Sequence, residues 1–432
     1  MGRVLVAGAL AAPLSVGLPA AAQARWGTPF QFTAPGTLDV LAPQLAISSS
    51  GAAAAAFGMQ DVDTPGTSQG YLTLRSPRGA VGQPAAIGGA SQILAEAYDH
   101  GGLELLTGTT AADQVCCSSA QAVAVSAAGR PAPPRTLVSG LTGPTLAQLQ
   151  PLAGGQMLAA VATERGVWVV QSAKANRFGA QHLLTGGGLM PSALATAWLG
   201  GQATIVAWTG ASGTAGAADP RTIAYALGSR TSAPRRVRTA ITVPAGHRVD
   251  ELGVAARAGS ATVAWIESWF DGHGNYHSQV RAADVAPHAA ATTLSAASRL
   301  ASGLSFAGDP AGDQALSWES CTVNDACTTQ VAVRGAHGSF GGARALGAID
   351  SSQTPALTVG AKGQAVVAWV RGGRPVAAVA RTPGRAFGAA QSLSSSTYAD
   401  DIALASGAGG RALAAWTQGT LNPSVVGAAY SG

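Results

Sequence analysis

The sequence is poor in charged and aromatic residues. Charged residues make up 11% of the 432 positions and aromatic residues 5%, and lysine occurs only at positions 174 and 362. Disorder is not expected, because disordered chains combine low hydrophobicity with high net charge, whereas 47% of this chain is apolar. No basic run is longer than the arginine pair in the PRRVR segment at 234–238, and the net charge is only +5. We therefore expect no nucleic-acid partner.

Long apolar runs are missing beyond residue 24, so we expect no membrane span after signal cleavage. Residues 1–24 have the pattern of an export signal: Arg3, an apolar stretch from Val4 to Leu18, and the small-residue site Ala22-Gln23-Ala24. An uncleaved anchor is the alternative, although the prolines and many alanines of this stretch make a weak membrane helix. The sequence predicts a signal peptide at 1–24, one domain at 25–432, and a secreted or cell-envelope location.

Cysteine is also scarce, with four residues in two close pairs. Cys321 and Cys327 bracket TVNDA, where a hairpin would bring their Cα atoms within disulfide range. We therefore predict a disulfide between them, as suits an exported protein. Cys116 and Cys117 are adjacent, and three states remain open: a strained ring, two thiols, or a metal site. No CxxC pair or histidine cluster accompanies them.

Tryptophan recurs through the second half of the chain. Trp208, Trp265, Trp318, Trp369 and Trp416 are 47 to 57 residues apart, and each closes a short run of small and branched apolar residues, such as ATIVAW and AVVAW. A repeat of about 50 residues with one strand signature per unit is typical of propellers and solenoids. We interpret these tryptophans as core residues, because the runs that they close are apolar on both faces.

The clearest unit contains four strand-like segments joined by glycine turns. They are PALTVGAKG (355–363), QAVVAWVRGG (364–373), RPVAAVARTPG (374–384) and AFGAAQSLSS (386–395). Four short antiparallel strands joined by turns make one propeller blade. The pattern can be followed back to residue 40, with Phe57 in the tryptophan position of the first unit.

The last unit supplies only three strands before residue 432, and the segment from Trp26 to Phe32 resembles the missing fourth strand. A strand from each terminus would close the ring and remove exposed sheet edges. We therefore predict an all-β fold, an eight-bladed propeller of four-stranded antiparallel blades whose last blade is closed by the N-terminal strand. Seven blades is the alternative, in case one early unit is an insertion.

The repeat resembles secreted bacterial β-propeller proteins in general. The recurring GH and WD pairs of WD repeats and the S-x-D-x-G-x-T-W turn of sialidase-type blades are not found. Kelch blades carry a glycine pair after the second strand, whereas here the glycine pairs mostly precede it. This resemblance implies a ring of blades and carries over no functional residue. We expect a monomer that needs no cofactor.

The candidate functional residues lie in loops between second and third strands, on the rim that also carries the connections between blades. Loops on a rigid scaffold are where binding residues concentrate. The predicted ligand-binding residues are Asp61, Asp63, Trp269, His273, Asn275 and His277. The catalytic candidates are Glu267, Asp271, Glu319 and Asp325.

Two of these groups support more than one hypothesis. Asp271, His273, Asn275 and His277 alternate, so an extended segment would place them on one side as metal ligands. The alternative, which we favour, is a polar hairpin tip, because the intervening glycines favour a turn; no metal site is predicted. Trp269 would stack on a sugar ring or else pack locally.

A third group, Tyr98-Asp99-His100, sits at a turn on the opposite rim. We interpret these residues as part of an ordinary turn, because no G-x-S-x-G elbow supplies the nucleophile of a catalytic triad.

These patterns favour a secreted or envelope-associated binding or interaction module, with an unknown protein or glycan at the loop rim. The alternative is a carbohydrate-active hydrolase or lyase that uses rim carboxylates of adjacent blades. Retaining hydrolysis would need the two carboxyl groups about 5 Å apart, and inverting hydrolysis would need them about 6.5–9.5 Å apart. A purely structural envelope protein is a third hypothesis. No catalytic motif is found.

Overall fold

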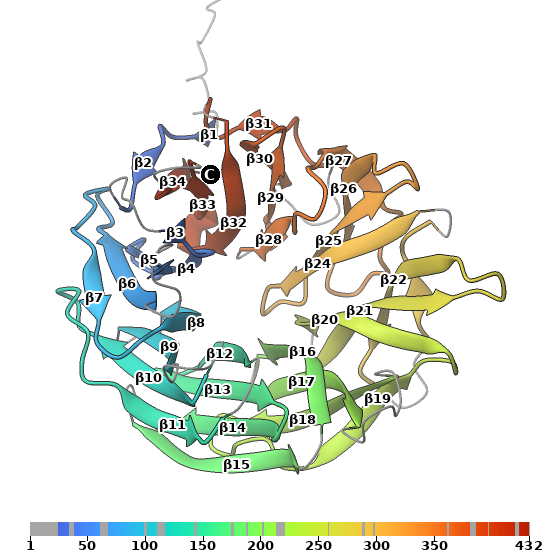
Figure 1. The fold of residues 1–432 in the computed structure, drawn as a ribbon, viewed down its shortest axis with the longest axis horizontal. Helices are drawn as coiled ribbons and strands as arrows, with labels where there is room; N and C mark the ends of the chain where they lie inside the picture. The colour runs from blue at the N-terminus through green and yellow to red at the C-terminus, as the bar shows by residue number, and fades with distance from the viewer. Residues whose placement is uncertain are drawn as a thin grey trace, which may run out of the picture.

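The computed structural model describes residues 25–33, 39–60, 68–98, 102–109, 117–141, 145–173, 177–186, 189–200, 203–212, 221–257, 259–286, 290–296, 299–360, 363–380, 386–395, 397–419 and 423–431. Within these ranges the chain forms eight antiparallel sheets arranged as blades in a ring (Figure 1). The prediction of an eight-bladed propeller is confirmed. The described residues contain no helix long and apolar enough to cross a membrane.

The first four blades follow one another along the chain. Blade 1 contains β3 (Asp39–Val40), β4 (Gln44–Ile47), β5 (Ala53–Gln60), β6 (Ser68–Arg75) and β7 (Ala85–Ile87). Blade 2 contains β8 (Gln92–Tyr98), β9 (Leu103–Thr109), β10 (Ser119–Val125) and β11 (Arg135–Ser139). Blade 3 contains β12 (Leu146–Leu152), β13 (Gln156–Thr163), β14 (Gly166–Ser172) and β15 (Phe178–Gly186). Blade 4 contains β16 (Leu189–Trp198), β17 (Ala203–Ser212), β18 (Thr222–Ser229) and β19 (Val237–Thr242).

The next three blades repeat this order, with the first strand of each nearest the centre of the ring (Figure 1). Blade 5 contains β20 (His247–Arg257), β21 (Ser260–Phe270), β22 (Tyr276–Asp284) and β23 (Thr292–Thr293). Blade 6 contains β24 (Leu300–Gly308), β25 (Gln314–Cys321), β26 (Cys327–Arg334) and β27 (Arg344–Ala348). Blade 7 contains β28 (Ala356–Val359), β29 (Ala365–Arg371), β30 (Arg374–Ala380) and β31 (Gln391–Ser392).

Blade 8 joins the two ends of the chain, as the sequence predicts. Its own strands are β32 (Ala399–Ser406), β33 (Ala412–Gln418) and β34 (Ser424–Ser431), and the short 3₁₀ turn Ala408–Gly410 links the first two. β1 (Arg25–Trp26) and β2 (Phe30–Gln31) pair with β34, so that Trp26 lies opposite Tyr430 and Phe30 opposite Gly427. A Cβ at Gly427 would lie 2.7 Å from the ring of Phe32, so glycine is needed for this close approach.

The recurring tryptophans form the core between blades. Trp265, Trp318, Trp369 and Trp416 are 0% exposed, Trp208 is 2% exposed, and Phe57 takes the equivalent place with 0%. Each large ring packs against small residues of a neighbouring blade, as Trp265 does against Ala207 of blade 4. Burying an indole of 150–250 Å² stabilises the fold by roughly 4–6 kcal/mol at 25 cal/mol per Å². The interpretation of these tryptophans as core is confirmed.

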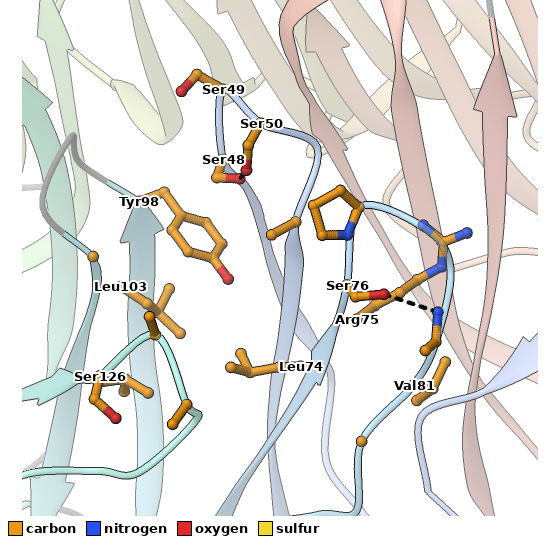
Figure 2. A pocket seen from close by; sticks show the side chains of 18 residues that line it. Ser48, Ser49, Ser50, Leu74, Arg75, Ser76, Val81, Tyr98, Leu103 and Ser126 are labelled. Atoms are coloured by element: carbon orange, nitrogen blue, oxygen red, sulfur yellow. Dashed lines mark hydrogen bonds between the residues drawn. The ribbon is translucent and has the colours of Figure 1, made fainter.

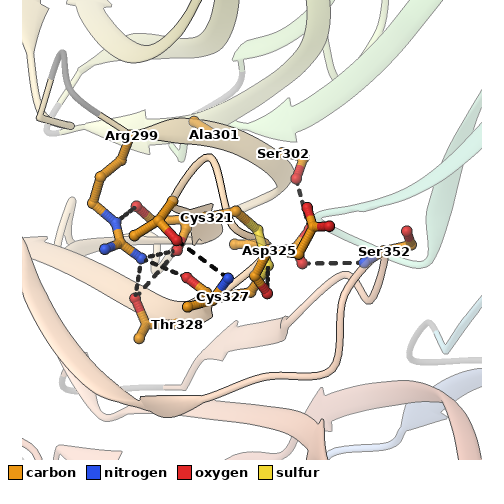
Figure 3. Close-up of a disulfide and its surroundings, with 12 residues drawn as sticks. Arg299, Ala301, Ser302, Cys321, Asp325, Cys327, Thr328 and Ser352 are labelled. Carbon is orange, nitrogen blue, oxygen red and sulfur yellow. Dashed lines mark hydrogen bonds between the residues drawn. A yellow bond between two sulfur atoms is a disulfide. The ribbon is translucent and has the colours of Figure 1, made fainter.

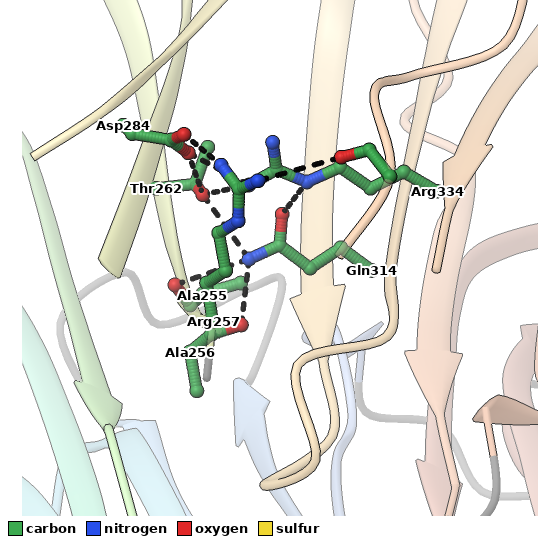
Figure 4. A network of polar contacts seen from close by, with 8 residues as sticks. Ala255, Ala256, Arg257, Thr262, Asp284, Gln314 and Arg334 are labelled. Atoms are coloured by element: carbon green, nitrogen blue, oxygen red, sulfur yellow. Dashed lines mark hydrogen bonds and ion pairs between the residues drawn. The ribbon is translucent and has the colours of Figure 1, made fainter. Parts of the chain in front are cut away.

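Polar side chains also join neighbouring blades. Glu251 of blade 5 accepts hydrogen bonds from the backbone amides of Gly303 and Leu304 in blade 6, at 2.9 and 2.5 Å. At the other end of the same interface, Arg334 of blade 6 binds Asp284 of blade 5 at 2.9 Å (Figure 4). These contacts fix the relative position of blades 5 and 6.

Candidate functional site

The two rims of the propeller carry different groups. The rim with the loops between second and third strands is here called the loop rim, and it also carries the links between blades. The opposite rim, here called the turn rim, carries the turns between first and second strands and those between third and fourth strands. The sequence places its candidates on the loop rim.

Glu267, on β21, is 2% exposed, and both of its carboxylate oxygens have partners. Oε1 lies 2.6 Å from Nδ1 of His247, and Oε2 accepts a hydrogen bond from Arg281 Nη1 at 2.8 Å. The indole N–H of Trp265 lies 3.4 Å from Oε2. Because residues two apart on a strand share a face, Glu267 points with Trp265 toward blade 4. These partners hold the carboxylate in place within blade 5.

Trp269 is stacked between two histidines. Its ring centroid lies 4.7 Å from that of His247 and 5.3 Å from that of His277, with interplanar angles of 8° and 17°. The three residues lie opposite one another on β20, β21 and β22. Because each histidine ring stacks on the indole, this arrangement matches local packing better than a platform for a sugar ring.

Asp271 organises the turn that follows Trp269. Its Oδ1 accepts hydrogen bonds from the backbone amides of His273 and Asn275, at 2.8 and 2.9 Å. Its Oδ2 accepts from Asn275 Nδ2 and lies 3.0 Å from His277 Nε2. Hydrogen bonds from the Asn275 side chain, from His277 and from these amides hold the pKa of Asp271 well below its usual range. The segment is thus a polar hairpin tip built around one carboxylate.

Glu319, on β25, is 3% exposed and is also held by fixed partners. Its Oε2 accepts a hydrogen bond from Ser302 at 2.6 Å, and its Oε1 accepts one from the Ser352 amide at 3.1 Å. Ser352 lies between blades 6 and 7, so Glu319 faces blade 7. Figure 3 shows Ser302 and Ser352, the two hydrogen-bond partners of Glu319. Glu267 and Glu319 therefore point toward different neighbouring blades and do not converge.

The disulfide between Cys321 and Cys327 is confirmed (Figure 3), with a Cα–Cα distance of 4.0 Å. It closes the hairpin whose turn contains Asp325 at φ 57°, a left-handed conformation that aspartate tolerates. Among the described residues, Glu319, Cys321 and Cys327 are the one group whose three ligand atoms lie within 4.8 Å of one another. Because the two sulfurs are bonded to each other, they are not available as metal ligands.

Five residues of the candidate groups and cysteine pairs lie outside the described residues: Asp61, Asp63, Asp99, His100 and Cys116. Cys117 is disulfide-bonded, which excludes its reduced state in this structure.

A groove of about 700 Å³ lies on the turn rim between blades 1 and 2 (Figure 2). We call it the serine groove, because Ser48, Ser49 and Ser50 of the β4–β5 turn line one side of it. Tyr98 lies across from them and directs its hydroxyl into the groove, and Leu74 lies deeper (Figure 2). The sequence predicts only a turn at the Tyr98 segment, and this groove was not predicted.

Glu96 lies two residues before Tyr98 on β8, on the same face of the strand. Both of its carboxyl oxygens are buried without a hydrogen-bond partner. Burial raises the pKa of Glu96 well above its usual range, and the nearby Ala46 amide offsets only part of this effect. Burial and the proximity of Glu96 also raise the pKa of Tyr98 to about 12. Both groups therefore favour their protonated forms beside the groove.

Comparisons with known proteins show the fold. No protein-family model matches the sequence, and no curated protein matches it. A solved structure of a polysaccharide lyase, the PL25 ulvan lyase, is 10% identical, covers 93% of this chain and 95% of its own, and has a TM-score of 0.51. A puromycin hydrolase S511A mutant complexed with PGG is 17% identical and has a TM-score of 0.48; the match covers 90% of this chain but only 61% of the hydrolase. A protein of unknown function from Dyadobacter fermentans is 10% identical over 95% of this chain and all of its own, with a TM-score of 0.45. The chain is a β-propeller protein, and at these identities the likeness carries no activity.

Proposed function

We propose that this protein is an exported binding module that takes a glycan in the serine groove. The observation that carries the proposal is the groove itself, about 700 Å³ in volume, where Tyr98 lies across from Ser48 and Ser50, whose hydroxyls are hydrogen-bonded to each other at 2.9 Å. Binding sites of this size are mostly apolar, with a small number of placed polar groups that fix the ligand. Serine and tyrosine hydroxyls both donate and accept hydrogen bonds, as sugar hydroxyls do.

The export part of the proposal rests on the signal pattern of residues 1–24 and on the Cys321–Cys327 disulfide. Disulfides persist in oxidising compartments and are rare in the cytosol. A mature protein that begins at Arg25 is the expected product, and the mass of the exported chain measures this directly.

The alternative function, a hydrolase or lyase that acts on carbohydrates, has less support from the geometry. A glycoside hydrolase of the common type needs two carboxyl groups on either side of one bond, and this alternative relies on such a pair from adjacent blades. Glu267 and Glu319 are each engaged by neighbouring side chains or amides and face different blades. Asp271 is likewise engaged within its own turn.

A glycan array probed with residues 25–432 tests the proposal. We expect binding to a subset of oligosaccharides, and we expect Ser49→Trp to abolish it by filling the mouth of the groove. Ser49 is exposed at a turn, so the larger side chain is compatible with the fold. The matched control is Ser351→Trp, at an exposed position in the link between blades 6 and 7 on the opposite rim.

Two outcomes would contradict the proposal. Silence of the folded wild-type protein across the array would count against glycan binding, and unchanged binding by Ser49→Trp would count against the groove. Mass spectrometry of a bound oligosaccharide after incubation separates the alternative: an unchanged mass supports a binding module, and cleavage products support an enzyme.

A further inference from the structure

A second cleft, of about 450 Å³, lies on the turn rim between blades 8 and 1. We call it the arginine cleft, because Arg25, Arg75 and Arg411 all line it. Arg25 comes from the strand that closes the ring, Arg75 from the end of β6, and Arg411 from the position just before β33. Trp26, tilted against Tyr430 with ring centroids 5.4 Å apart, forms another part of the lining.

Among the described residues, no carboxylate forms an ion pair with any of these three arginines. The residues that line the cleft include no aspartate or glutamate. In the described part of the chain, the arginines that form ion pairs are Arg248, Arg257, Arg281 and Arg334, all in blades 5 and 6. Three guanidinium groups, which stay protonated in proteins, therefore share one cleft without a counter-charge.

The contacts that these arginines do make leave donors unused. The Arg75 guanidinium lies 4.7 Å from the centre of the Phe30 ring, and Arg411 Nη1 donates to the Ser50 carbonyl at 3.3 Å. The Nε of Arg75 and the indole nitrogen of Trp26 are both buried without a hydrogen-bond partner. A buried donor without an acceptor destabilises the fold, so an acceptor that enters this cleft would recover part of that cost.

The geometry points to an anion-binding subsite: we propose that the arginine cleft binds the oxyanion group of a ligand, whether carboxylate, sulfate or phosphate. Guanidinium groups bind such oxygens through paired, charge-assisted hydrogen bonds. The volume of 450 Å³ exceeds what a bare oxyanion fills, so the group belongs to a larger molecule. The inference goes beyond the glycan proposal, because the cleft lies on the other side of blade 1 from the serine groove.

The two clefts nevertheless adjoin each other. Arg75 and Pro77 line both of them. Figure 2 shows Arg75 directed away from Tyr98, toward the far side of the strand that carries Leu74. A single ligand that fills both clefts would lie across the turn-rim end of blade 1. Its anionic group would lie at the arginines, and its neutral part would lie in the serine groove.

Titration calorimetry of residues 25–432 tests the cleft with three simple probes: sulfate, inorganic phosphate and acetate, each at constant ionic strength. We expect saturable binding of at least one probe. Arg411→Gln should weaken it about tenfold, the scale of one charge-assisted hydrogen bond. Arg411 is exposed, so this variant leaves the fold intact, and Arg75→Gln provides a second test.

The matched control is Arg78→Gln, which removes the same charge from the same turn as Arg75 but does not line the cleft. We expect it to bind like the wild type. A stronger response to sulfate or phosphate than to acetate would indicate a sulfated or phosphorylated ligand, and the reverse order would indicate a carboxylate.

The proposal is overturned if no probe binds saturably, or if Arg78→Gln weakens binding as much as Arg411→Gln does, which would show a general charge effect. These outcomes are separate from those of the glycan array. The array can fail while sulfate binds, and a neutral glycan can bind while all three anions fail.

Discussion

Replacing Arg334 by alanine should destabilise the propeller by about 3 kcal/mol. Arg334 is 7% exposed and lies at the interface of blades 5 and 6 (Figure 4). Its Nε donates to Gln314 Oε1 at 2.7 Å, and its Nη2 binds Thr262 and Asp284. Burial and the nearby charge of Arg257 lower its pKa to about 10, which still leaves the guanidinium charged at neutral pH.

The magnitude follows from the groups that lose a partner. Gln314 is 2% exposed, so its Oε1 would be left buried without a donor, at about 1–3 kcal/mol. The guanidinium also lies 4.5 Å from the centre of the Phe340 ring, and losing that contact removes about 0.5–2 kcal/mol more. Asp284 contributes little, because it keeps its ion pair with Arg257 and its side chain is 34% exposed.

Guanidinium chloride unfolding, followed by tryptophan fluorescence, measures the effect. The control is Arg238→Ala at an exposed position on β19, which should stay within about 0.5 kcal/mol of the wild type. Arg334→Met separates packing from polarity, because it keeps an apolar stem and removes every hydrogen bond. A loss of less than about 1 kcal/mol for Arg334→Ala would refute the reasoning. Wild-type stability in Arg334→Met would show that the polar network adds nothing beyond its packing.

Two further predictions concern Glu96 and the disulfide. The folded pKa of Glu96 is raised, so its contribution to stability is complete below its unfolded pKa of about 4.3 and is lost as the pH rises toward the folded value, at about 1.4 kcal/mol per pH unit. Glu96→Gln should therefore be more stable than the wild type at pH 7 and equal to it near pH 4. Urea unfolding at both pH values measures this difference. Equal stability of the two proteins at pH 7 would contradict the burial of a protonated carboxyl. Cys321→Ser with Cys327→Ser should lower the free energy of unfolding by roughly 2 kcal/mol, because the bond closes a short loop with a sequence separation of 6. Reductant also opens the disulfide of Cys117, so the wild type should lose about this amount more than the double variant does when both are reduced. An equal response of the two proteins would argue against a stabilising Cys321–Cys327 bond.

The architecture could be predicted because each blade needs the same core. A central strand packed on both faces requires an apolar run, and a large buried ring recurs on this strand in the last five blades, at Trp208, Trp265, Trp318, Trp369 and Trp416. The spacing of these residues gives the number of blades. The closing strand was predictable for a related reason, because Trp26 and Phe30 fill the strand positions that the last unit lacks.

The environment of each candidate residue could not be predicted in the same way. The indole of Trp269 is stacked between His247, which lies 22 positions earlier on a different strand, and His277. Register across three strands decides that arrangement, and a loop motif read along the chain does not contain it. Likewise, the sequence identifies Glu267 and Glu319 as acidic residues at the ends of strands. It does not show that one carboxylate faces blade 4 and the other faces blade 7.

The clefts on the turn rim depend on contacts even farther apart in the sequence. Arg25, Arg75 and Arg411 share no local motif, and they come together because the ring closes between the first and last blades. Similar turns recur around the ring, since every blade repeats the same strand order. Blade 8 differs because its outer strand comes from the other end of the chain, and that strand brings Arg25 and Trp26 into the cleft. Closure of the ring therefore covers the edge of β34 and creates the position where these three arginines meet.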